Sequence, residues 1–390
     1  MTGFRTEFLG CKVSLADSQA IRERLIADGH HEAETAAVRV VTTCCVTAEA
    51  VAKSRKAVRR AARSAERVVV TGCAANLRDA GFDRLADNVT VISGPPETAA
   101  ARVAGWLGRL GCAGGRAPAF ARTRAYVKIQ DGCSFGCSYC VIPAVRGASR
   151  SRPAAAVLDE VGRRAGQGHR EVVLTGINLG CFRDREAGMR LPDLLLAVAD
   201  TPGLDRVRLS SIEVNHLTPA LLEAFGHPRV APHLHVPMQS GDDDVLRAMR
   251  RHYTRTAFLA ALGRAREHVA GLNLTTDVIV GHPAETDEAF NATVEALRAA
   301  GFTRVHVFPY SPRPDTRDAG IDPVPPAVKA ERSRIVRELA DRQAAAHRRR
   351  LRGSRQLVLV ESADGRGYSA DYTPLRAPGG SPGELVEVVA

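Results

Sequence analysis

Long apolar runs are absent from this sequence. No stretch of about 18 or more uncharged apolar residues occurs, which excludes an ordinary membrane-spanning helix. The first residues, "MTGFRTEFLGC", also lack the basic start and apolar run of a signal peptide. We therefore expect a cytoplasmic protein, in which thiols stay reduced and cysteines are more often metal ligands than disulfide partners.

Metal-binding spacing is missing among the twelve histidines. The segments "GHHEA" and "PHLHV" are interpreted as surface and strand residues rather than as ligands. The nine cysteines therefore carry the metal hypothesis.

Length and charge set the general class. A chain of 390 residues with 45% hydrophobic residues is long enough for two or three globular domains. The 54 Lys and Arg residues exceed the 43 Asp and Glu residues, which gives a formal net charge of +11. This charge favours a polyanionic partner such as nucleic acid. A coding bias toward arginine is the alternative explanation.

Three zones of composition indicate an α/β protein. Residues 1 to about 105 alternate short apolar strands with helical stretches, and residues 110–124 are predicted to be a linker because they are rich in Gly, Pro and Ala. Between about 125 and 310, six apolar runs alternate with helical stretches, which predicts a parallel sheet curled into a partial (β/α)6 barrel with its active site at the carboxyl ends of the strands. The runs are "AYVKIQ", "EVVLTGIN", "RVRLSSIE", "HLHVPMQSG", "TTDVIVG" and "RVHVFPYSP".

The end of the chain changes character. A basic helix is predicted over residues 331–353, and short strands separated by Gly and Pro then predict a small all-β barrel. The predicted domains are an amino-terminal open parallel α/β domain over residues 1–110, a barrel domain over 119–350 and a small β domain over 351–390.

The segment "DGCSFGCSYC" places Cys133, Cys137 and Cys140 on one short loop. Three thiolates can bind three irons of a four-iron cluster and leave the fourth iron open to a ligand. The spacing Cys-x3-Cys-x2-Cys is similar to that of the radical S-adenosylmethionine (SAM) superfamily. A structural zinc site is the alternative, although such sites usually have paired cysteines and a nearby fourth ligand.

A second set of thiols lies in the first zone. Cys11, Cys44 and Cys73 each follow a predicted parallel strand. Because ligands gather outside the carboxyl ends of such strands, thiols that are distant in sequence can meet there. We expect a second, auxiliary cluster at this edge, whereas the alternative is three buried cysteines that act as small apolar residues.

Motifs along nearly the whole chain resemble the radical SAM methylthiotransferases, and most closely the MtaB type, which acts on threonylcarbamoyladenosine in tRNA. In the first zone they are "LGCKVSLADSQ", "VVTTCCVTAEA" and "VVVTGCAAN", and in the second they include "VKIQDGCSFGCSYCVIPAVRGASRSRP", "LHVPMQSGDDDVLRAMRRHYT" and "TTDVIVGHPAETDEAF". The tail resembles the TRAM RNA-binding module of this family. The sequence departs from the family at Ser14, His282 and Cys45. Cys45 leaves open which of two neighbouring thiols binds iron, and Cys44 is chosen because it aligns with the family's cysteine.

The resemblance implies a reaction and its cofactors. The C–H bond at carbon 2 of an adenine next to the anticodon, at position 37, is replaced by C–S–CH3, which requires a radical because this bond is neither acidic nor electrophilic. Two 4Fe–4S clusters and SAM are implied. One SAM supplies the methyl group to sulfur on the auxiliary cluster, and a second is cleaved to a radical at the cluster of Cys133, Cys137 and Cys140. The implied partners are tRNA and an electron donor such as a flavodoxin-type reductant, with neither a membrane nor DNA.

The resemblance also implies a set of residues that contact SAM: Tyr139, Thr175, Gly176, Glu213 and Gln239. For Glu213 and Gln239 the alternative is a polar residue that ends a barrel strand.

Arg146, Arg150 and Arg152 follow the cysteine loop, where they are candidates for the SAM carboxylate, for RNA phosphate or for a solvated loop. They are also the first candidates for the carboxylate of a threonylcarbamoyl group. Cys112 and Cys181 are predicted to be structural.

Three other functions remain open at this point. Related methylthiotransferases modify adenosine that carries an isopentenyl group, or an aspartate of a ribosomal protein. A protein without catalysis, in which an iron–sulfur cluster only supports RNA binding, is the other class. Cleavage of SAM to 5′-deoxyadenosine would distinguish the enzymes from the binding protein.

Overall fold

The computed structural model describes residues 3–78, 80–108 and 123–390. Most of the predicted linker, with Cys112, lies outside these residues. The chain contacts divide the protein into two compact units, which we describe separately. Unit 1 comprises residues 1–120, 132–149 and 311–320, and unit 2 comprises residues 121–131, 150–310 and 321–390. Among the described residues, no helix combines the length and apolar character needed to cross a membrane.

Unit 1 is built on a five-stranded parallel sheet with the strand order β2-β1-β3-β4-β5. The strands are β1 (Gly3–Phe8), β2 (His31–Glu32), β3 (Val38–Thr43), β4 (Arg67–Gly72) and β5 (Val89–Val91). The helices are α1 (Lys12–Ala27), α2 (Ala48–Ser64), α3 (Ala99–Gly108) and α4 (Ile142–Arg146), with short 3-10 turns η1 (Cys73–Asn76), η2 (Asp83–Leu85) and η3 (Pro96–Thr98).

Helices cover both faces of this sheet. Successive side chains of a strand point to opposite faces, so neighbouring residues of β3 and β4 pack against different helices. Val40 of β3 and Val69 of β4 pack with α1 and α3, whereas Val41 and Val70 pack with α2 on the other side. Val145 of α4 joins the second core. The loop that contains Cys133, Cys137 and Cys140 therefore folds with the amino-terminal sheet, although the sequence resemblance places it in the barrel domain.

Unit 2 contains six parallel strands in chain order, as the sequence predicts. They are β6 (Arg124–Lys128), β9 (Glu171–Thr175), β12 (Arg206–Leu209), β13 (His233–His235), β14 (Asn273–Val280) and β15 (Arg304–Pro309). They form two parallel sheets, β12-β9-β6 and β13-β14-β15. A backbone hydrogen bond of 2.9 Å from Ile212 N–H to the His235 carbonyl oxygen links the two sheets across β12 and β13. The predicted α/β class and partial barrel are confirmed.

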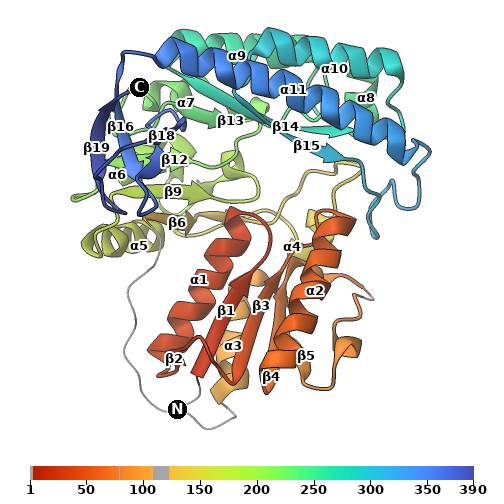
Figure 1. The fold of residues 1–390 in the computed structure, drawn as a ribbon, viewed down its shortest axis with the longest axis vertical. Coiled ribbons are helices and arrows are strands. Elements are labelled where there is room, and N and C mark those ends of the chain that lie inside the picture. The colour runs from red at the N-terminus through yellow and green to blue at the C-terminus, as the bar shows by residue number, and fades with distance from the viewer. Residues whose placement is uncertain (1–2, 79, 109–122) are drawn as a thin grey trace. The chain divides into compact units, whose positions relative to one another are not determined.

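Helices cover the outside of these strands (Figure 1). They are α5 (Ala154–Gly166), α6 (Leu191–Ala199), α7 (Pro219–Ala224), α8 (Asp243–Ala248), α9 (Arg255–His268), α10 (Asp287–Ala300) and α11 (Pro326–Leu351). Two short 3-10 turns, η4 (Leu179–Cys181) and η5 (Val214–His216), and two small strand pairs, β7 (Gln130–Asp131) with β8 (Arg150–Ser151) and β10 (Arg183–Asp184) with β11 (Met189–Arg190), complete the unit. Alternate strand residues such as Val127, Leu174 and Leu209 join the core with the helices. The remaining positions face the inside of the sheet and are mostly polar.

The tail forms a four-stranded antiparallel sheet, β18-β17-β16-β19, within unit 2. Its strands are β16 (Arg355–Val360), β17 (Arg366–Tyr368), β18 (Pro374–Arg376) and β19 (Leu385–Val389). This confirms the predicted strands at the end of the chain, while their assignment to a TRAM module stays a prediction.

Buried charges attach the tail to the amino ends of the barrel strands. Arg124, Arg206 and Arg208 surround the fully buried carboxylate of Glu171, and Arg208 also donates to the Ser369 and Ala370 carbonyl oxygens of the tail. Burial acts to raise the pKa of Glu171, but the three arginines outweigh it and lower that pKa. The tail is therefore part of the polar core of unit 2.

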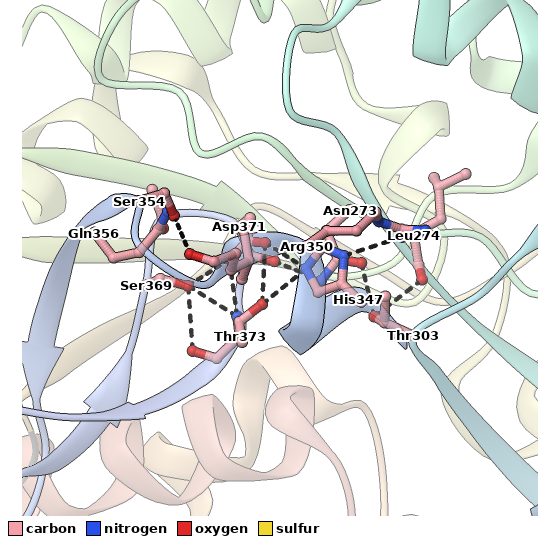
Figure 2. A network of polar contacts seen from close by, with 12 residues as sticks. Asn273, Leu274, Thr303, His347, Arg350, Ser354, Gln356, Ser369, Asp371 and Thr373 are labelled. Carbon is pink, nitrogen blue, oxygen red and sulfur yellow. Dashed lines mark hydrogen bonds and ion pairs between the residues drawn. The ribbon is translucent and has the colours of Figure 1, made fainter. Parts of the chain in front are cut away.

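A second polar network holds the tail beside β14 and α11 (Figure 2). Asn273 donates to the Asp371 carbonyl oxygen at 2.7 Å, and the Asp371 carboxylate lies 2.8 Å from Nε2 of His347 on α11. Ser369 and Thr373 donate hydrogen bonds to the same carboxylate. This network joins residues far apart in the sequence.

Candidate active site

The structure places Cys11, Cys44 and Cys73 at one edge of the sheet of unit 1. Cys11 precedes α1, Cys44 follows β3, and Cys73 begins η1 directly after β4. Strands β1, β3 and β4 are neighbours and parallel, so their carboxyl ends lie side by side. The sequence expectation that these thiols gather at one edge agrees with this placement, and their role as ligands stays a prediction.

Gly10 shows how closely the first two segments approach each other. Its φ of +119° lies in the region that favours glycine, and a Cβ there would lie 3.1 Å from Sγ of Cys44 and 2.9 Å from Oγ of Ser14. The Cys11 sulfur lies 3.8 Å from the same Ser14 hydroxyl. A glycine before Cys11 thus allows its backbone to come against Cys44.

The thiols of this edge differ in their electrostatics. A hydrogen bond with Cys45 is the main cause that lowers the pKa of Cys73, with Arg146 adding to it against the effect of burial. The same hydrogen bond raises the pKa of Cys45, which is completely buried. Burial raises the pKa of Cys44 to about 11. The opposite directions of the two pKa shifts fit a neutral Cys45 thiol beside a Cys73 thiolate.

Arg146 occupies a place that none of its sequence interpretations describes. Its Nε lies 3.0 Å from the Cys73 sulfur and its Nη2 lies 2.7 Å from Oδ2 of Asp17 on α1, with the guanidinium side chain only 1% exposed. By contrast, Arg152 forms an ion pair of 2.7 Å with Glu160, and Arg150 lies half-buried in β8. Arg146 therefore belongs to the thiol site of the sheet edge.

Backbone hydrogen bonds close the loop that contains Cys133, Cys137 and Cys140. The Cys133 N–H donates to the Gly147 carbonyl oxygen at 3.0 Å, and the Cys140 N–H donates to that of Cys137 at 3.2 Å. Gly132 has a φ of +68°, and a Cβ there would lie 2.1 Å from the Ala148 carbonyl oxygen, so only glycine fits.

The three thiols of this loop are accessible in part. The Phe135 N–H lies 3.4 Å from the Cys133 sulfur, a donor that favours a thiolate. Tyr139 is also partly exposed, next to Cys140. Three partly exposed thiols and an N–H donor fit an iron–sulfur cluster with one open iron. The set at the sheet edge, in which Cys44 and Cys73 are buried, Cys11 is exposed and Arg146 lies beside Cys73, fits a second cluster by the same chemistry.

In unit 2, the carboxyl ends of β9 and β12 present polar atoms that suit a bound ligand. Among the described residues, the hydroxyls of Thr175 and Ser210 and the amide of Asn178 are buried without a hydrogen-bond partner. Thr175 ends β9, and Ser210 follows β12 beside it, where its N–H bonds to the Leu174 carbonyl oxygen. Buried polar atoms normally have partners, so this group fits a polar ligand such as SAM.

Asn178 and Ser210 were not in the predicted set. Asn178 ends the predicted run "EVVLTGIN" and Ser210 follows the apolar part of "RVRLSSIE", so the rule that active sites lie at the carboxyl ends of barrel strands applies to both.

The other predicted SAM residues lie at the same ends of their strands. Gly176 approaches the Gln130 backbone so closely that a Cβ would lie 2.9 Å from its carbonyl oxygen. Glu213 forms an ion pair with Arg251, which is almost completely buried. Gln239 has a φ of +64°, which is uncommon for a residue other than glycine. Strained positions of this kind are frequent at functional sites.

A group of His and Asp residues was missed because its members are far apart in the sequence. His235, Asp277 and His306 come from the adjacent strands β13, β14 and β15, and their ligand atoms lie within 4.8 Å of one another. His235 Nε2 lies 3.1 Å from Asp277 Oδ1, and Nδ1 lies 2.9 Å from the Thr275 hydroxyl.

Cys181 was predicted to be structural, and it belongs neither to the His and Asp group nor to the two sets of three cysteines. Its sulfur lies 3.7 Å from Nε2 of His216, in unit 2. Its predicted structural role stays a prediction.

Comparison with protein families and relatives supports the interpretation of both the amino-terminal sheet and the barrel strands. Residues 127–297 match the radical SAM superfamily, and residues 4–94 match a family described as "Uncharacterized protein family UPF0004". The threonylcarbamoyladenosine tRNA methylthiotransferase MtaB of Thermotoga maritima is 34% identical over 394 residues, covering 95% of this chain and 89% of the relative. The protein of the same name from Chlamydia pneumoniae is also 34% identical, with 96% and 91% covered. A tRNA-2-methylthio-N(6)-dimethylallyladenosine synthase of Sorangium cellulosum is 36% identical, with 91% and 81% covered.

Solved structures share the fold. The radical SAM methyltransferase TsrM of Kitasatospora setae aligns with a TM-score of 0.59 at 16% identity, over 80% of this chain and 75% of that protein. The cobalamin-dependent radical SAM enzyme OxsB aligns with a TM-score of 0.55 at 8% identity, over 89% and 56%. At such low identities the likeness concerns the fold alone.

Proposed function

Because the chain belongs to the radical SAM methylthiotransferase family, we propose that it converts N6-threonylcarbamoyladenosine at position 37 of tRNA to the 2-methylthio derivative. The observation that carries this proposal is the alignment of 95% or more of the chain, at 34% identity, with two proteins named for that reaction. The same alignment makes the chain an enzyme that transfers a sulfur-containing group.

Membership of the radical SAM superfamily implies SAM and a 4Fe–4S cluster. We assign this cluster to Cys133, Cys137 and Cys140, where it would supply the electron that cleaves SAM. The cluster would receive this electron from a donor such as a flavodoxin-type reductant. The residues assigned to SAM are Tyr139, Thr175, Gly176, Glu213 and Gln239, joined by Asn178 and Ser210. Their role is to bind and orient SAM. The buried polar atoms at the ends of β9 and β12 support this assignment.

A second cluster is assigned to Cys11, Cys44 and Cys73, where it would supply sulfur. Three observations support it. The thiols lie at the ends of adjacent strands, Cys44 and Cys73 are almost fully buried, and a buried arginine donates to the Cys73 sulfur. A buried guanidinium needs anionic partners, and a sulfur that binds iron provides one.

Basic surfaces of unit 2 suit a tRNA partner. The last turn of α11 exposes Arg348, Arg349 and Arg350. On the tail, Arg366 and Arg376 line an open hollow of about 600 Å³ together with Tyr368. Arginine and an aromatic ring are the side chains that bind phosphates and stacked bases in RNA.

The test is mass spectrometry of tRNA nucleosides from cells with and without the gene. Loss of the 2-methylthio form of threonylcarbamoyladenosine on deletion, with its return on complementation, is the expected result. If deletion removed only the 2-methylthio form of isopentenyl-type adenosine, that nucleoside, the second candidate, would be the substrate instead.

That second candidate is adenosine with a dimethylallyl group, favoured by the relative from Sorangium cellulosum. The two substrates differ by a carboxylate, which only the threonyl group has. A cation should therefore meet it, and the burial of Arg146 against Cys73 leaves Arg150 and Arg152 as the candidates from the cysteine-loop segment. Incubation of the protein with tRNA of each kind, side by side, separates the two.

A further inference from the structure

Arg146 is a buried charged group to which the proposed chemistry assigns no role of its own. It ends α4, and its guanidinium lies between a carboxylate and a sulfur: Nη2 is 2.7 Å from Oδ2 of Asp17, and Nε is 3.0 Å from Sγ of Cys73. The exposed fractions of the Arg146 and Asp17 side chains are 1% and 6%. Cys73 is 4% exposed.

A guanidinium that is buried in this way requires hydrogen-bond acceptors for its N–H groups. Moving a charged group out of water is unfavourable unless good geometry and hydrogen bonding offset the lost hydration. Asp17 satisfies Nη2. The group opposite Nε is a sulfur, and a neutral thiol is a weak acceptor, whereas a thiolate that binds iron accepts a charge-assisted hydrogen bond.

The position of Arg146 in the chain links the two cysteine sets. It lies in the segment of residues 132–149 that contains Cys133, Cys137 and Cys140, and this segment packs in unit 1. A second contact supports the same segment from the sheet edge, since Asn76 of η1 donates to the Val145 carbonyl oxygen at 2.7 Å. Helix α4 is thus tied to η1, the turn that begins with Cys73.

We propose that Arg146 is a positioning residue of the auxiliary cluster. Its Nε–H donates to the sulfur of Cys73, which favours the reduced form of the cluster and raises its reduction potential, because hydrogen bonds to the sulfur ligands are one of the means by which proteins set this potential. Asp17 fixes the orientation of the guanidinium. The proposal rests on the proposed function, since it requires that Cys73 binds iron.

The test isolates the auxiliary cluster in the full-length chain. Replacing Cys133, Cys137 and Cys140 by Ala removes the other cluster, and the protein is reconstituted anaerobically with iron and sulfide. Iron and sulfide per chain are measured, and the midpoint potential is obtained by a redox titration followed by electron paramagnetic resonance. Arg146→Met, Arg146→Lys and Asp17→Asn are compared in this background.

We expect Arg146→Met to lower the equilibrium constant for reduction of the cluster about tenfold. For one electron this corresponds to a midpoint potential that is lower by about 59 mV. Arg146→Lys keeps the charge but not the fork of donors, so an intermediate shift is expected. Asp17→Asn weakens the anchor of the guanidinium, which lowers the potential, but it also removes a buried negative charge, which raises it, so the net shift should be smaller than in Arg146→Met. Arg146→Lys also tests the proposal if Arg146→Met fails to fold.

Arg22→Met is the matched control, since Arg22 is an arginine of α1 that is paired at 2.6 Å with Glu32 away from the cysteines. It should lower the melting temperature without changing the potential. An unchanged potential in both Arg146→Met and Arg146→Lys, with full iron content, would overturn the role of Arg146 alone. Absence of iron from the background protein with native Arg146 would instead overturn the second cluster, and the proposal with it.

Discussion

The two sets of three cysteines are built in different ways. Cys133, Cys137 and Cys140 lie within one loop, remain partly exposed, and receive local backbone hydrogen bonds. The second set joins three strand ends. Cys44 and Cys73 are almost fully buried, Cys11 is exposed, and distant side chains support the set. A loop with exposed thiols suits a cluster that must admit a ligand such as SAM. A set held by a folded sheet suits a cluster whose position relative to the sheet must not change.

The largest expected effect concerns the loop set. Cys133→Ala should abolish SAM cleavage, because loss of one of only three ligands releases the cluster. The measurement is 5′-deoxyadenosine formed by anaerobically reconstituted protein with a strong reductant. Cys181→Ala is the control and should retain the native rate, since this cysteine lies 3.7 Å from Nε2 of His216 and is assigned to neither cluster. A native rate in Cys133→Ala would show that the ligands are elsewhere.

The next effect separates the two sets. Cys73→Ala should retain SAM cleavage and lose the methylthiolated product, since its cluster is assigned to sulfur supply. Both products are measured in one reaction with tRNA from cells that lack the gene. Normal formation of the 2-methylthio nucleoside by this variant would contradict the two-cluster hypothesis.

A subtler comparison decides between two neighbouring cysteines. In the background without Cys133, Cys137 and Cys140, Cys44→Ala should lose most of its iron. Cys45→Ala should keep its iron, because the pKa of Cys45 is raised and its side chain is completely buried, both of which favour a neutral thiol over an iron-bound thiolate. Iron and sulfide analysis of the two variants is the measurement. The reverse result would make Cys45 the ligand.

Much of this arrangement could be predicted from the sequence. The six apolar runs become β6, β9, β12, β13, β14 and β15, because strands buried on a parallel sheet are nearly continuous in apolar residues. The strand-end rule also brought Cys11, Cys44 and Cys73 to one edge. The partners of Arg146 could not be predicted, since Cys73 and Asp17 lie 73 and 129 residues away. Side-chain contacts at such separations depend on how helices pack, which no local pattern encodes.

The tail offers the same contrast between local and assembled features. Arg366 and Arg376 are exposed on neighbouring strands and interact locally with Asp364. Replacing both by Ala should lower tRNA affinity severalfold and reduce the slope of log affinity against log salt by roughly one for each lost phosphate contact. Filter binding over a salt series is the measurement. Arg334→Ala, an exposed arginine that is paired with two glutamates on α11, is the control. Equal behaviour of both variants would exclude this face of the tail from RNA binding.

The smallest effect concerns the assembled network around Asp371, shown in Figure 2. Burial acts to raise the pKa of Asp371, but hydrogen bonds from His347, Ser369 and Thr373 outweigh it, so the pKa lies below its ordinary value. A carboxylate of this kind stabilises the folded state fully above its unfolded pKa of about 3.9, and this contribution is lost as the pH falls through the lower folded value. Asp371→Asn should therefore destabilise the attachment of the tail by about 1–3 kcal/mol at neutral pH.

The difference between Asp371→Asn and the native protein should begin to narrow as the pH falls below about 4, where the carboxyl of the unfolded chain is protonated, and should disappear only below the lower pKa of the folded carboxyl. Hydrogen exchange of residues 355–389, followed by mass spectrometry and corrected for the intrinsic effect of pH, measures how stably the tail is attached in Asp371→Asn and in the native protein at each pH. Glu387→Gln, which removes an exposed carboxylate paired with Arg355, is the control and should change exchange little at either pH. A constant difference between Asp371→Asn and the native protein across this range would show that packing of the side chain, rather than its charge, holds the tail on the barrel.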